Sequence, residues 1–302
     1  MGVKISSIIP RTEIKLSDLS GKKIAIDTYI ELYQFLKSMP RFTNKEGLVS
    51  THLIGLFNRT VHLMELGIKP IFIFDGQTPE IRRHRRITFG NFLPKINKTI
   101  TQDIIDSSKE LILALGLPVI QAPSEGEAQA AFLCEQNDAW AVASEDFDSL
   151  IFGAKRMIQN FTISKTKVQS NKKKVLIGTY IIELEKVLEE LTITQDELIV
   201  LAILCGTDFN KGIDGIGQKR GLTLIKKYKN NFDDLFEEVK WKNTLFPNNS
   251  WKDIFYFLKT MPVTDTYTLE WKEIDKERIL RLLVDTYQFN KENVERMLKK
   301  VS

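Results

Sequence analysis

The chain has 302 residues, of which 43% are hydrophobic and 27% charged, with a formal net charge of +4. This composition is typical of a globular protein and excludes fibrous and disordered classes. No apolar run reaches the about 20 residues that a bilayer-spanning helix needs, so we expect no membrane contact. Two cysteines are too few for a disulfide framework, which favours a reducing, intracellular compartment. With three histidines and two cysteines there is little material for zinc, so oxygen atoms must hold any metal ion.

Short apolar runs that end in or precede acids dominate the first half. They are apolar on both faces, which is typical of interior strands of a parallel sheet. Helical periodicity lies between them, at residues 53–64 and 104–115. Alternating strands and helices predict an α/β fold with helices on both sides of the sheet. The strands are expected at residues 23–27, 70–75, 117–121 and 139–143.

The second half has a different character. From Thr179 onward the pattern becomes mainly helical, with an apolar helix at residues 198–205. Two basic segments interrupt the regular patterns and are expected as loops. One is residues 82–101, which contains a glycine and a proline, and the other is residues 165–174.

Seven acids occupy places where a parallel sheet gathers side chains, because ligand sites in such sheets lie beyond the carboxyl ends of the strands. Oxygen ligands without histidine suit Mg²⁺, and convergent carboxylates repel one another unless a cation neutralises them. Two such ions can flank a phosphodiester, activate the attacking water and stabilise the leaving oxygen. The candidate ligands are Asp27, Asp75, Glu125, Glu127, Asp146, Asp148 and Asp208.

Each acid also has a structural interpretation. An Asp after a strand often caps the next helix or turn, because its carboxylate accepts bonds from backbone N–H groups. Ser124 and Glu127 have the spacing of a capping box, and Asp208 can simply end the helix before it. Three strand-end acids together with two pairs of the E-x-E or D-x-D type favour a metal centre over seven separate caps.

A glycine-rich turn at residues 212–217 precedes an amphipathic helical stretch. Gly215 and Gly217 permit a tight turn, and a helix N-terminus presents free amides to a phosphate oxygen. Such contacts hold a nucleic-acid backbone without reading its sequence. A plain loop explains the glycines alone equally well, but together with a cluster of acids elsewhere the turn suggests a nuclease that grips duplex DNA some distance from the cut. The cations on the same side are Lys219, Arg220, Lys226 and Lys227.

Together these motifs resemble the flap endonucleases of the structure-specific 5′-nuclease superfamily, and the archaeal type in particular. The resemblance covers nearly the whole chain in the family's order. It rests on the stretches MGVKISSIIPR, GKKIAIDTYIELYQFL, THLIGLFNRTVHLMELGIKPIFIFDGQTPEIR, LGLPVIQAPSEGEAQAAFL, ASEDFDSLIFG, LAILCGTDFNKGIDGIGQKRGL and MPVTDTYTLEW. It implies a PIN-like parallel central sheet flanked by helices in a nuclease core at 1–208. It also implies a helix–two-turn–helix DNA-binding element and a helical C-terminal region at 209–302, packed on the core.

By this resemblance, all seven acids bind two Mg²⁺ ions, with Mn²⁺ as a substitute. Gly2 is placed near the active site, and Tyr33 matches an aromatic on which the base beside the scissile phosphate stacks, although alone it reads as a core tyrosine. The turn from Gly215 to Arg220 matches the element that grips the downstream duplex, with a K⁺ ion shared between protein carbonyls and phosphate. The residues implied in catalysis are Asp27, Asp75, Glu125 and Arg82, the last by contacting the scissile phosphate.

The implied activity is cutting of 5′ flaps at junctions of single and double strands, with a weaker 5′ exonuclease activity. The setting is Okazaki-fragment processing and DNA repair, the partner is flapped or branched DNA, and the chain is expected to be a monomer. The alternatives are an RNase H-like or PIN-type ribonuclease, and a DNA-junction scaffold that binds without cutting.

Two features depart from the family pattern. The segment at 82–106 is shorter than the family's helical arch, and the second gateway arginine falls near Phe89. Binding of a sliding clamp is left open, because no Gln-x-x-hydrophobic-x-x-aromatic-aromatic motif occurs before residue 302. With a weaker gate, we expect gapped, bubble and blocked-flap substrates to be accepted more readily. The cations that could replace the gateway residue are Arg83, Arg85 and Arg86.

Overall fold

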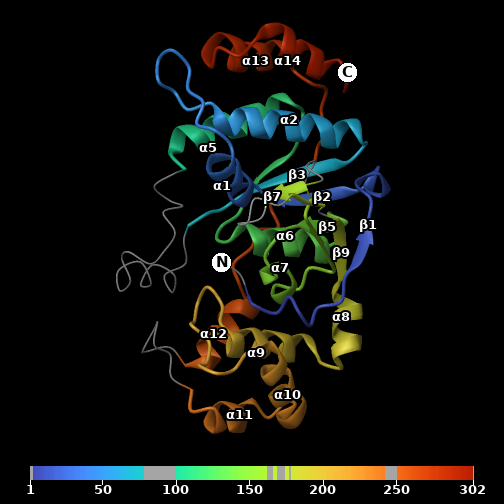
Figure 1. Cartoon of the computed structure of the whole chain (residues 1–302), viewed down its shortest axis with the longest axis vertical. Helices are drawn as coiled ribbons and strands as arrows, with labels where there is room; N and C mark the ends of the chain where they lie inside the picture. The colour runs from blue at the N-terminus through green and yellow to red at the C-terminus, as the bar shows by residue number, and fades with distance from the viewer. Residues whose placement is uncertain are drawn as a thin grey trace.

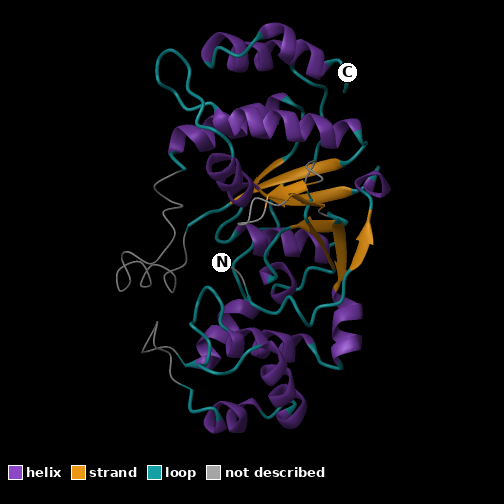
Figure 2. Cartoon of the chain, in the orientation of Figure 1, coloured by secondary structure: helices purple, strands orange, loops and turns teal. Residues whose placement is uncertain are grey.

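A seven-stranded mixed sheet lies at the centre of the fold, between layers of helices (Figures 1 and 2). The structure is a computed structural model that describes residues 3–77, 100–161, 166–168, 174–176, 178–241 and 250–301. The strand order is β1-β9-β6-β5-β2-β3-β4. The strands are β1 (Thr12–Ile14), β2 (Lys23–Asp27), β3 (Lys69–Phe74), β4 (Val119–Gln121), β5 (Ala141–Ala143), β6 (Arg156–Gln159) and β9 (Thr179–Glu183).

Five neighbouring strands, β6, β5, β2, β3 and β4, form the parallel core that the apolar runs predict. Strands β2 and β3 occupy residues 23–27 and 69–74, nearly as expected. Strand β4 begins at Val119 rather than at residue 117, since Pro118 has no N–H to donate to the ladder. The α/β prediction is confirmed.

The helical prediction from Thr179 onward is wrong at its beginning. Residues 179–183 form β9, which pairs antiparallel with both β6 and β1, and the next helix starts at Leu184. The run Thr-Tyr-Ile-Ile is rich in β-branched and aromatic side chains, which fit a pleated surface. The basic stretch at 165–174 is not simply a loop, because β7 (Thr166–Val168) and β8 (Lys174–Leu176) pair within and beside it.

The helices cover both faces of the sheet. Those of the first half are α1 (Thr28–Ser38), α2 (Thr51–Glu65), α5 (Gln102–Ala114), α6 (Gly126–Glu135) and α7 (Asp148–Ile151), with a short 3-10 turn η1 (Leu16–Leu19). Those of the second half are α8 (Leu184–Leu191), α9 (Gln195–Cys205), α10 (Gln218–Tyr228), α11 (Phe232–Glu238), α12 (Trp251–Lys259), α13 (Lys276–Leu280), the π-helical turn η2 (Arg281–Thr286) and α14 (Lys291–Leu298). Within the described ranges, no helix has the length and apolar character to cross a bilayer.

Alternating side chains of the central strands supply two separate cores. Ile24 and Ile26 of β2 pack in the cluster that also holds buried residues of α2 and α5, whereas Ala25 packs in the cluster beneath α6. This alternation is the two-residue period of a strand buried on both faces. A third cluster joins α7 to the apolar helix α9 and its neighbours α10 to α12.

The last part of the chain runs along most of the length of the molecule. From α12, in the lower group of helices in Figure 1, an extended segment passes α6 and leads to α13, η2 and α14 at the top. Gln129 of α6 exchanges two hydrogen bonds with the backbone of Thr264, at 2.8 and 2.9 Å. The last helices then pack against α2 and α5. The predicted boundary between the two regions, at residue 208, falls between α9 and α10, and these two helices pack against each other.

Candidate metal centre

Two of the acids end the central parallel strands and are held by backbone amides. Asp27 closes β2, is 5% exposed, and accepts hydrogen bonds from the N–H groups of Tyr29 and Ile30 at 2.9 and 3.2 Å. Asp75 follows β3, and its Oδ1 accepts a bond from the N–H of Gly126 at 2.7 Å. A Cβ on Gly126 would lie 2.8 Å from Asp75 Oδ1 and 3.7 Å from Asp27 Cγ. The start of α6 thus fits closely between the two carboxylates only because residue 126 is glycine.

A second group of acids is built from α6, the loop after β5, and α7. Glu127, in the first turn of α6, is buried, and its Oε1 accepts bonds from the hydroxyls of Ser144 and Ser149, the latter at 3.3 Å. Asp148 begins α7, and its Oδ1 accepts a bond from the N–H of Val3 at 3.1 Å. Segments from three parts of the chain therefore meet around these carboxylates.

Burial and mutual repulsion raise the pKa of three of these acids. The pKa of Asp27 lies well above its ordinary value because of burial, then the charges of Asp75 and Glu125, although the two backbone amides oppose this. Burial, followed by the charges of Asp148, Asp27 and Asp146, likewise raises the pKa of Glu127 well above its ordinary value. Each of these acids is thus more stable with a proton, or with a nearby cation, than as a bare carboxylate.

Burial and neighbouring charges also raise the pKa of the third acid, Asp148. The pKa of Asp148 rises to about 7, through burial first and then through the charges of Asp208 and Asp146. All seven predicted ligands therefore interact electrostatically as one group. Within the part of the chain that the structure describes, however, no three His, Cys, Asp or Glu side chains are already arranged as a ligand set for one ion. The acids are neighbours rather than a closed cage.

The capping alternatives have mixed outcomes. Asp27 does cap α1, so its structural and electrostatic roles coincide. The capping box of Ser124 and Glu127 does not form, because α6 begins after Glu125 and Glu127 accepts its bonds from two serines elsewhere. Helix α9 ends at Cys205 with Gly206 as its cap, so Asp208 lies beyond the helix end.

The glycine-rich turn is exposed and precedes α10 as predicted. Gly215 has a φ of +79°, a left-handed conformation that favours glycine, and Gly217 is the residue immediately before α10. The guanidinium of Arg220 donates to the carbonyl of Gly215 at 3.4 Å. Lys219, Lys226 and the rest of the predicted cations of this element are exposed, although Lys227 pairs with Glu238 at 2.7 Å.

Some predicted site residues lie outside the described residues. These are Gly2, Arg82, Arg83, Arg85 and Arg86, and with them most of the segment at 82–106. Tyr33 is described: it is half-buried on α1, packs against the core shared with α2, and has the ammonium of Lys37 5.6 Å from its ring centre. That position is compatible with the core interpretation of this tyrosine.

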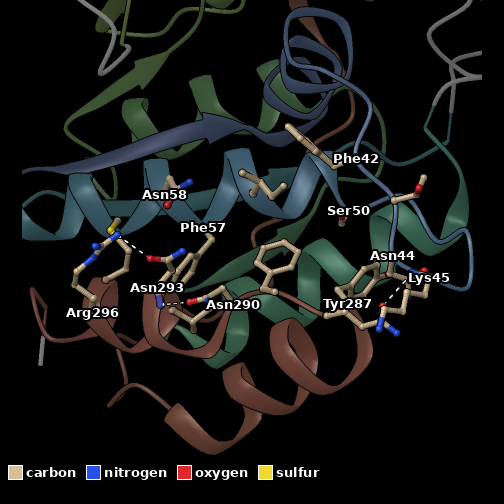
Figure 3. A pocket seen from close by; sticks show the side chains of 16 residues that line it. Phe42, Asn44, Lys45, Ser50, Phe57, Asn58, Tyr287, Asn290, Asn293 and Arg296 are labelled. Carbon is tan, nitrogen blue, oxygen red and sulfur yellow. Dashed lines mark hydrogen bonds between the residues drawn. The ribbon is translucent and has the colours of Figure 1, made fainter.

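Sequence reasoning missed a cavity of about 530 Å³ between α2, the loop before it and the C-terminal helices (Figure 3). Phe42 and Lys45 line it from the loop, Phe57 from α2, and Tyr287 and Asn293 from the end of the chain. Hydrogen bonds between residues 44 and 286 and between residues 45 and 288, each 3.0 Å, close its rim. No local pattern signals such a cavity, because its walls are about 240 positions apart in sequence.

Sequence reasoning also missed the groups that hold the acids in place. Ser144 and Ser149 bind Glu127, and the N–H of Val3 binds Asp148. The only available signal was that Ser144 directly precedes the Glu-Asp pair after β5. A serine before an acid is too common to be diagnostic.

Comparison with known protein families supports the class that this fold and site define. The model of the XPG N-terminal domain matches residues 1–90, and the model of the XPG I-region matches residues 116–208. Together they cover more than half of the chain and include all seven acids, with Asp208 as the last residue of the second match.

Whole-chain relatives narrow this class. The chain is 40% identical to flap endonuclease 1 of Pyrococcus abyssi and 38% identical to that of Aeropyrum pernix, and each match covers all of this chain and 94% of the relative. The solved flap endonuclease-1 from Methanococcus jannaschii superposes with a TM-score of 0.81 at 33% identity, covering 99% of this chain and 98% of that one. The catalytic core of Rad2 in complex with DNA substrate shares the fold, with a TM-score of 0.77 at 22% identity. The chain belongs to the flap endonuclease family.

Proposed function

We propose that this chain is a structure-specific 5′ nuclease that hydrolyses DNA flaps where single and double strands meet, during replication and repair inside the cell. The observation that carries the proposal is the group of seven acids at the carboxyl edge of the sheet, in a chain that belongs to the flap endonuclease family. The sequence alternatives, a ribonuclease and a binding scaffold, have no structural observation of their own in their favour.

Divalent metal ions fit this set of acids. Every donor is a carboxylate oxygen, which suits Mg²⁺. The raised pKa values of Asp27, Glu127 and Asp148 reflect burial first and then mutual repulsion, and a cation would relieve the repulsion. Mg²⁺ also keeps several of its waters, so acids that stand near one another without enclosing an ion can still hold it through water. Two Mg²⁺ ions, with Mn²⁺ as a substitute, would supply an activated water and charge neutralisation at the leaving oxygen.

The chain's own residues prepare this chemistry by fixing the carboxylates before substrate arrives. Backbone amides hold Asp27 and Asp75, and two buried serine hydroxyls hold Glu127. Preorganised groups need not be reoriented during the reaction, which lowers its barrier. Asp27, Asp75 and Glu125 thus act in catalysis as ligands, and Arg82, outside the described residues, is proposed to steady the scissile phosphate.

Duplex DNA is proposed to bind along the turn at 212–217 and helix α10, some distance from the acids. The exposed cations of this element would contact phosphates, and the carbonyls of the turn are proposed to share a K⁺ ion with the DNA backbone. In this proposal residues 1–208 cut and residues 209–302 hold the duplex, and one chain suffices. Gly2, Tyr33 and the arginines 83, 85 and 86 remain proposed DNA contacts.

The test is cleavage of a 5′-labelled double-flap DNA with Mg²⁺, beside the same flap with a bulky group on its 5′ end. A matched pair of variants locates the site: Asp146→Asn removes a proposed ligand, and Glu145→Gln removes the exposed acid next to it, whose carboxylate accepts the N–H of Asn160 at 2.9 Å. We expect Asp146→Asn to lose at least about 100-fold in rate and to retain flap binding, and Glu145→Gln to remain active.

The outcomes separate the alternatives. Equal cleavage by both variants would remove the acids from the mechanism. Binding without any Mg²⁺-dependent cutting in the unaltered protein would favour the scaffold, and preference for an RNA–DNA hybrid would favour the ribonuclease. Cutting of the blocked flap alongside the free one would mean that the gate does not discriminate.

A further inference from the structure

A basic cavity lies at the edge of the sheet opposite the acids, where the parallel strands begin. It has a volume of about 210 Å³. Lys22 and Lys23 line it from the start of β2, Trp140 from the approach to β5, and Arg156 from the start of β6, with Asn137 at its rim. Because these strands are parallel, their amino ends meet at one edge just as their carboxyl ends meet at the other (Figure 1).

Two tryptophans hold these cations in place without neutralising them. The ammonium of Lys22 and the guanidinium of Arg156 each lie 5.2 Å from the ring centre of Trp140, and the ammonium of Lys23 lies 5.5 Å from that of Trp271. A cation over an aromatic face is attracted by the ring quadrupole but keeps its full charge. The positive groups are therefore positioned around the cavity and remain able to bind an anion.

Acids of the described residues do not neutralise this site. None of them forms an ion pair with Lys22, Lys23 or Arg156. Glu183 stands opposite Arg156 in the register of β6 and β9, but its carboxylate pairs with Lys186.

The acid next to the rim is engaged as well. Asp138 follows Asn137 in sequence, and its Oδ2 accepts the hydroxyl of Tyr267 at 2.6 Å. Arg156 uses one donor on the carbonyl of Trp140, at 3.4 Å, and a guanidinium has five donors in all. Most of the donor capacity around the cavity is thus available to a ligand.

The cavity size limits what the ligand can be. A water occupies about 30 Å³ in the liquid, so about 210 Å³ holds several waters or one tetrahedral oxyanion with a few waters. Pockets for whole drug-sized molecules start at about 300 Å³. A phosphate group fits, whereas a complete nucleotide does not, and the cations carry the charge opposite to that of the phosphate.

We propose that Lys22 and Arg156, both beside the ring of Trp140, and Lys23, beside Trp271, form a phosphate-binding site at the amino edge of the sheet, separate from the acids. The phosphate group can belong to a nucleic-acid strand that passes this edge or can be free in solution. This inference does not rest on the proposed nuclease function, and its test needs no cleavage.

The experiment measures binding of inorganic phosphate, and separately of a single-stranded oligothymidylate, to the full chain in EDTA. The readout is the indole N–H signal of Trp140 in the NMR spectrum, assigned with Trp140→Phe. The test variant is Lys22→Gln with Arg156→Gln. The control is Lys252→Gln with Lys291→Gln, which removes the same charge from exposed lysines that already pair with Asp233 and Glu295.

We expect phosphate to shift the Trp140 signal saturably in the unaltered chain and in the control, and the test variant to bind at least about tenfold more weakly. If oligothymidylate binding also loses about 1.4 units of its salt slope in the test variant, the phosphate belongs to nucleic acid. If only inorganic phosphate binding falls, the ligand is free phosphate. Equal phosphate binding by test variant and control, or no shift at all in the unaltered chain, would overturn the site.

A second variant works without removing any cation. Asn137→Asp adds a carboxylate at the rim. The φ of this residue is +64°, which Asp tolerates, and its Oδ1 already accepts a hydrogen bond from the ammonium of Lys155 at 2.9 Å. We expect weaker phosphate binding with unchanged thermal unfolding. Unchanged phosphate affinity in Asn137→Asp would count against the proposal.

Discussion

Lowering the pH should destabilise the fold through one buried histidine. His52 of α2 is fully buried, and its Nε2 lies 2.8 Å from the hydroxyl of Ser107. That hydroxyl donates to the carbonyl of Asp103 at 2.6 Å, so it accepts from Nε2–H, and Nδ1 has no hydrogen-bond partner among the described residues. Protonation would place an N–H with no acceptor in the core. Burial accordingly lowers the pKa of His52 to about 4.

The sign and size of the effect follow from this pKa. In the unfolded chain the histidine takes up a proton near its ordinary value of 6.5, whereas in the folded chain it stays neutral until about pH 4. The contribution of His52 to the free energy of unfolding is therefore at its full value above about pH 7. It falls as the pH drops through 6.5 and reaches its minimum below pH 4. The full loss is about 3 kcal/mol, of which about 2 kcal/mol falls between pH 7 and pH 5.

Urea unfolding at pH 7 and pH 5, followed by tryptophan fluorescence, measures this loss. The comparison is with His52→Gln, which retains a donor for Ser107 and cannot titrate. Buried acids such as Glu31, whose pKa burial raises despite Arg59, change stability in the opposite direction, but they do so equally in both proteins. We expect the unaltered chain to lose about 2 kcal/mol more than the variant. Parallel losses in the two proteins would refute the assignment of a neutral, buried His52.

Three further predictions address the rest of the molecule. Gly116→Ala should lower the free energy of unfolding by about 3 kcal/mol, because φ is +74° and a Cβ would lie 2.1 Å from a backbone carbonyl oxygen of the segment that crosses it. Gly153→Ala is the control: φ is +90° but the space around it is open, so its cost should be only about 1 kcal/mol. Lys219→Gln with Arg220→Gln should lower the salt slope of duplex binding by about 2, and an unchanged slope would exclude the turn as the grip. Mg²⁺ at about 100 times its Kd should raise the free energy of unfolding by about 2.7 kcal/mol. EDTA should abolish this gain, and Asp148→Asn should reduce it. A melting temperature that does not change with Mg²⁺ would contradict a metal centre.

The elements that the sequence predicted well are those whose signal is local. Residues 23–27 and 70–75 are apolar on both faces, so a buried parallel strand is the simplest solution for them, and the acids at their ends must then meet. Strand β9 was missed for the opposite reason. Its five residues precede a helix directly, and their strand conformation depends on pairing with β6 and β1, which are distant in sequence.

Other features depend on long-range packing and had no sequence signal. The serine hydroxyls that hold Glu127 come from the loop after β5 and from α7, and only the fold brings them to α6. The partnership of His52 with Ser107 joins α2 to α5 across 55 positions. No local pattern around His52 signals this partner, because Ser107 lies in another helix.

Both charged edges of the sheet follow from one property of its strands. Strand β2 begins with Lys23 and ends with Asp27, and the run of β3 begins with Lys69 and leads into Asp75. Because the strands are parallel, these like ends align, so the acids gather at one edge and the cations at the other. The acidic edge could be inferred from sequence because clustered carboxylates are costly without a cation, whereas cations at strand ends are common and usually solvated. What makes the basic edge a candidate site is the pair of tryptophans that fix its cations, and only the folded chain brings those rings to them.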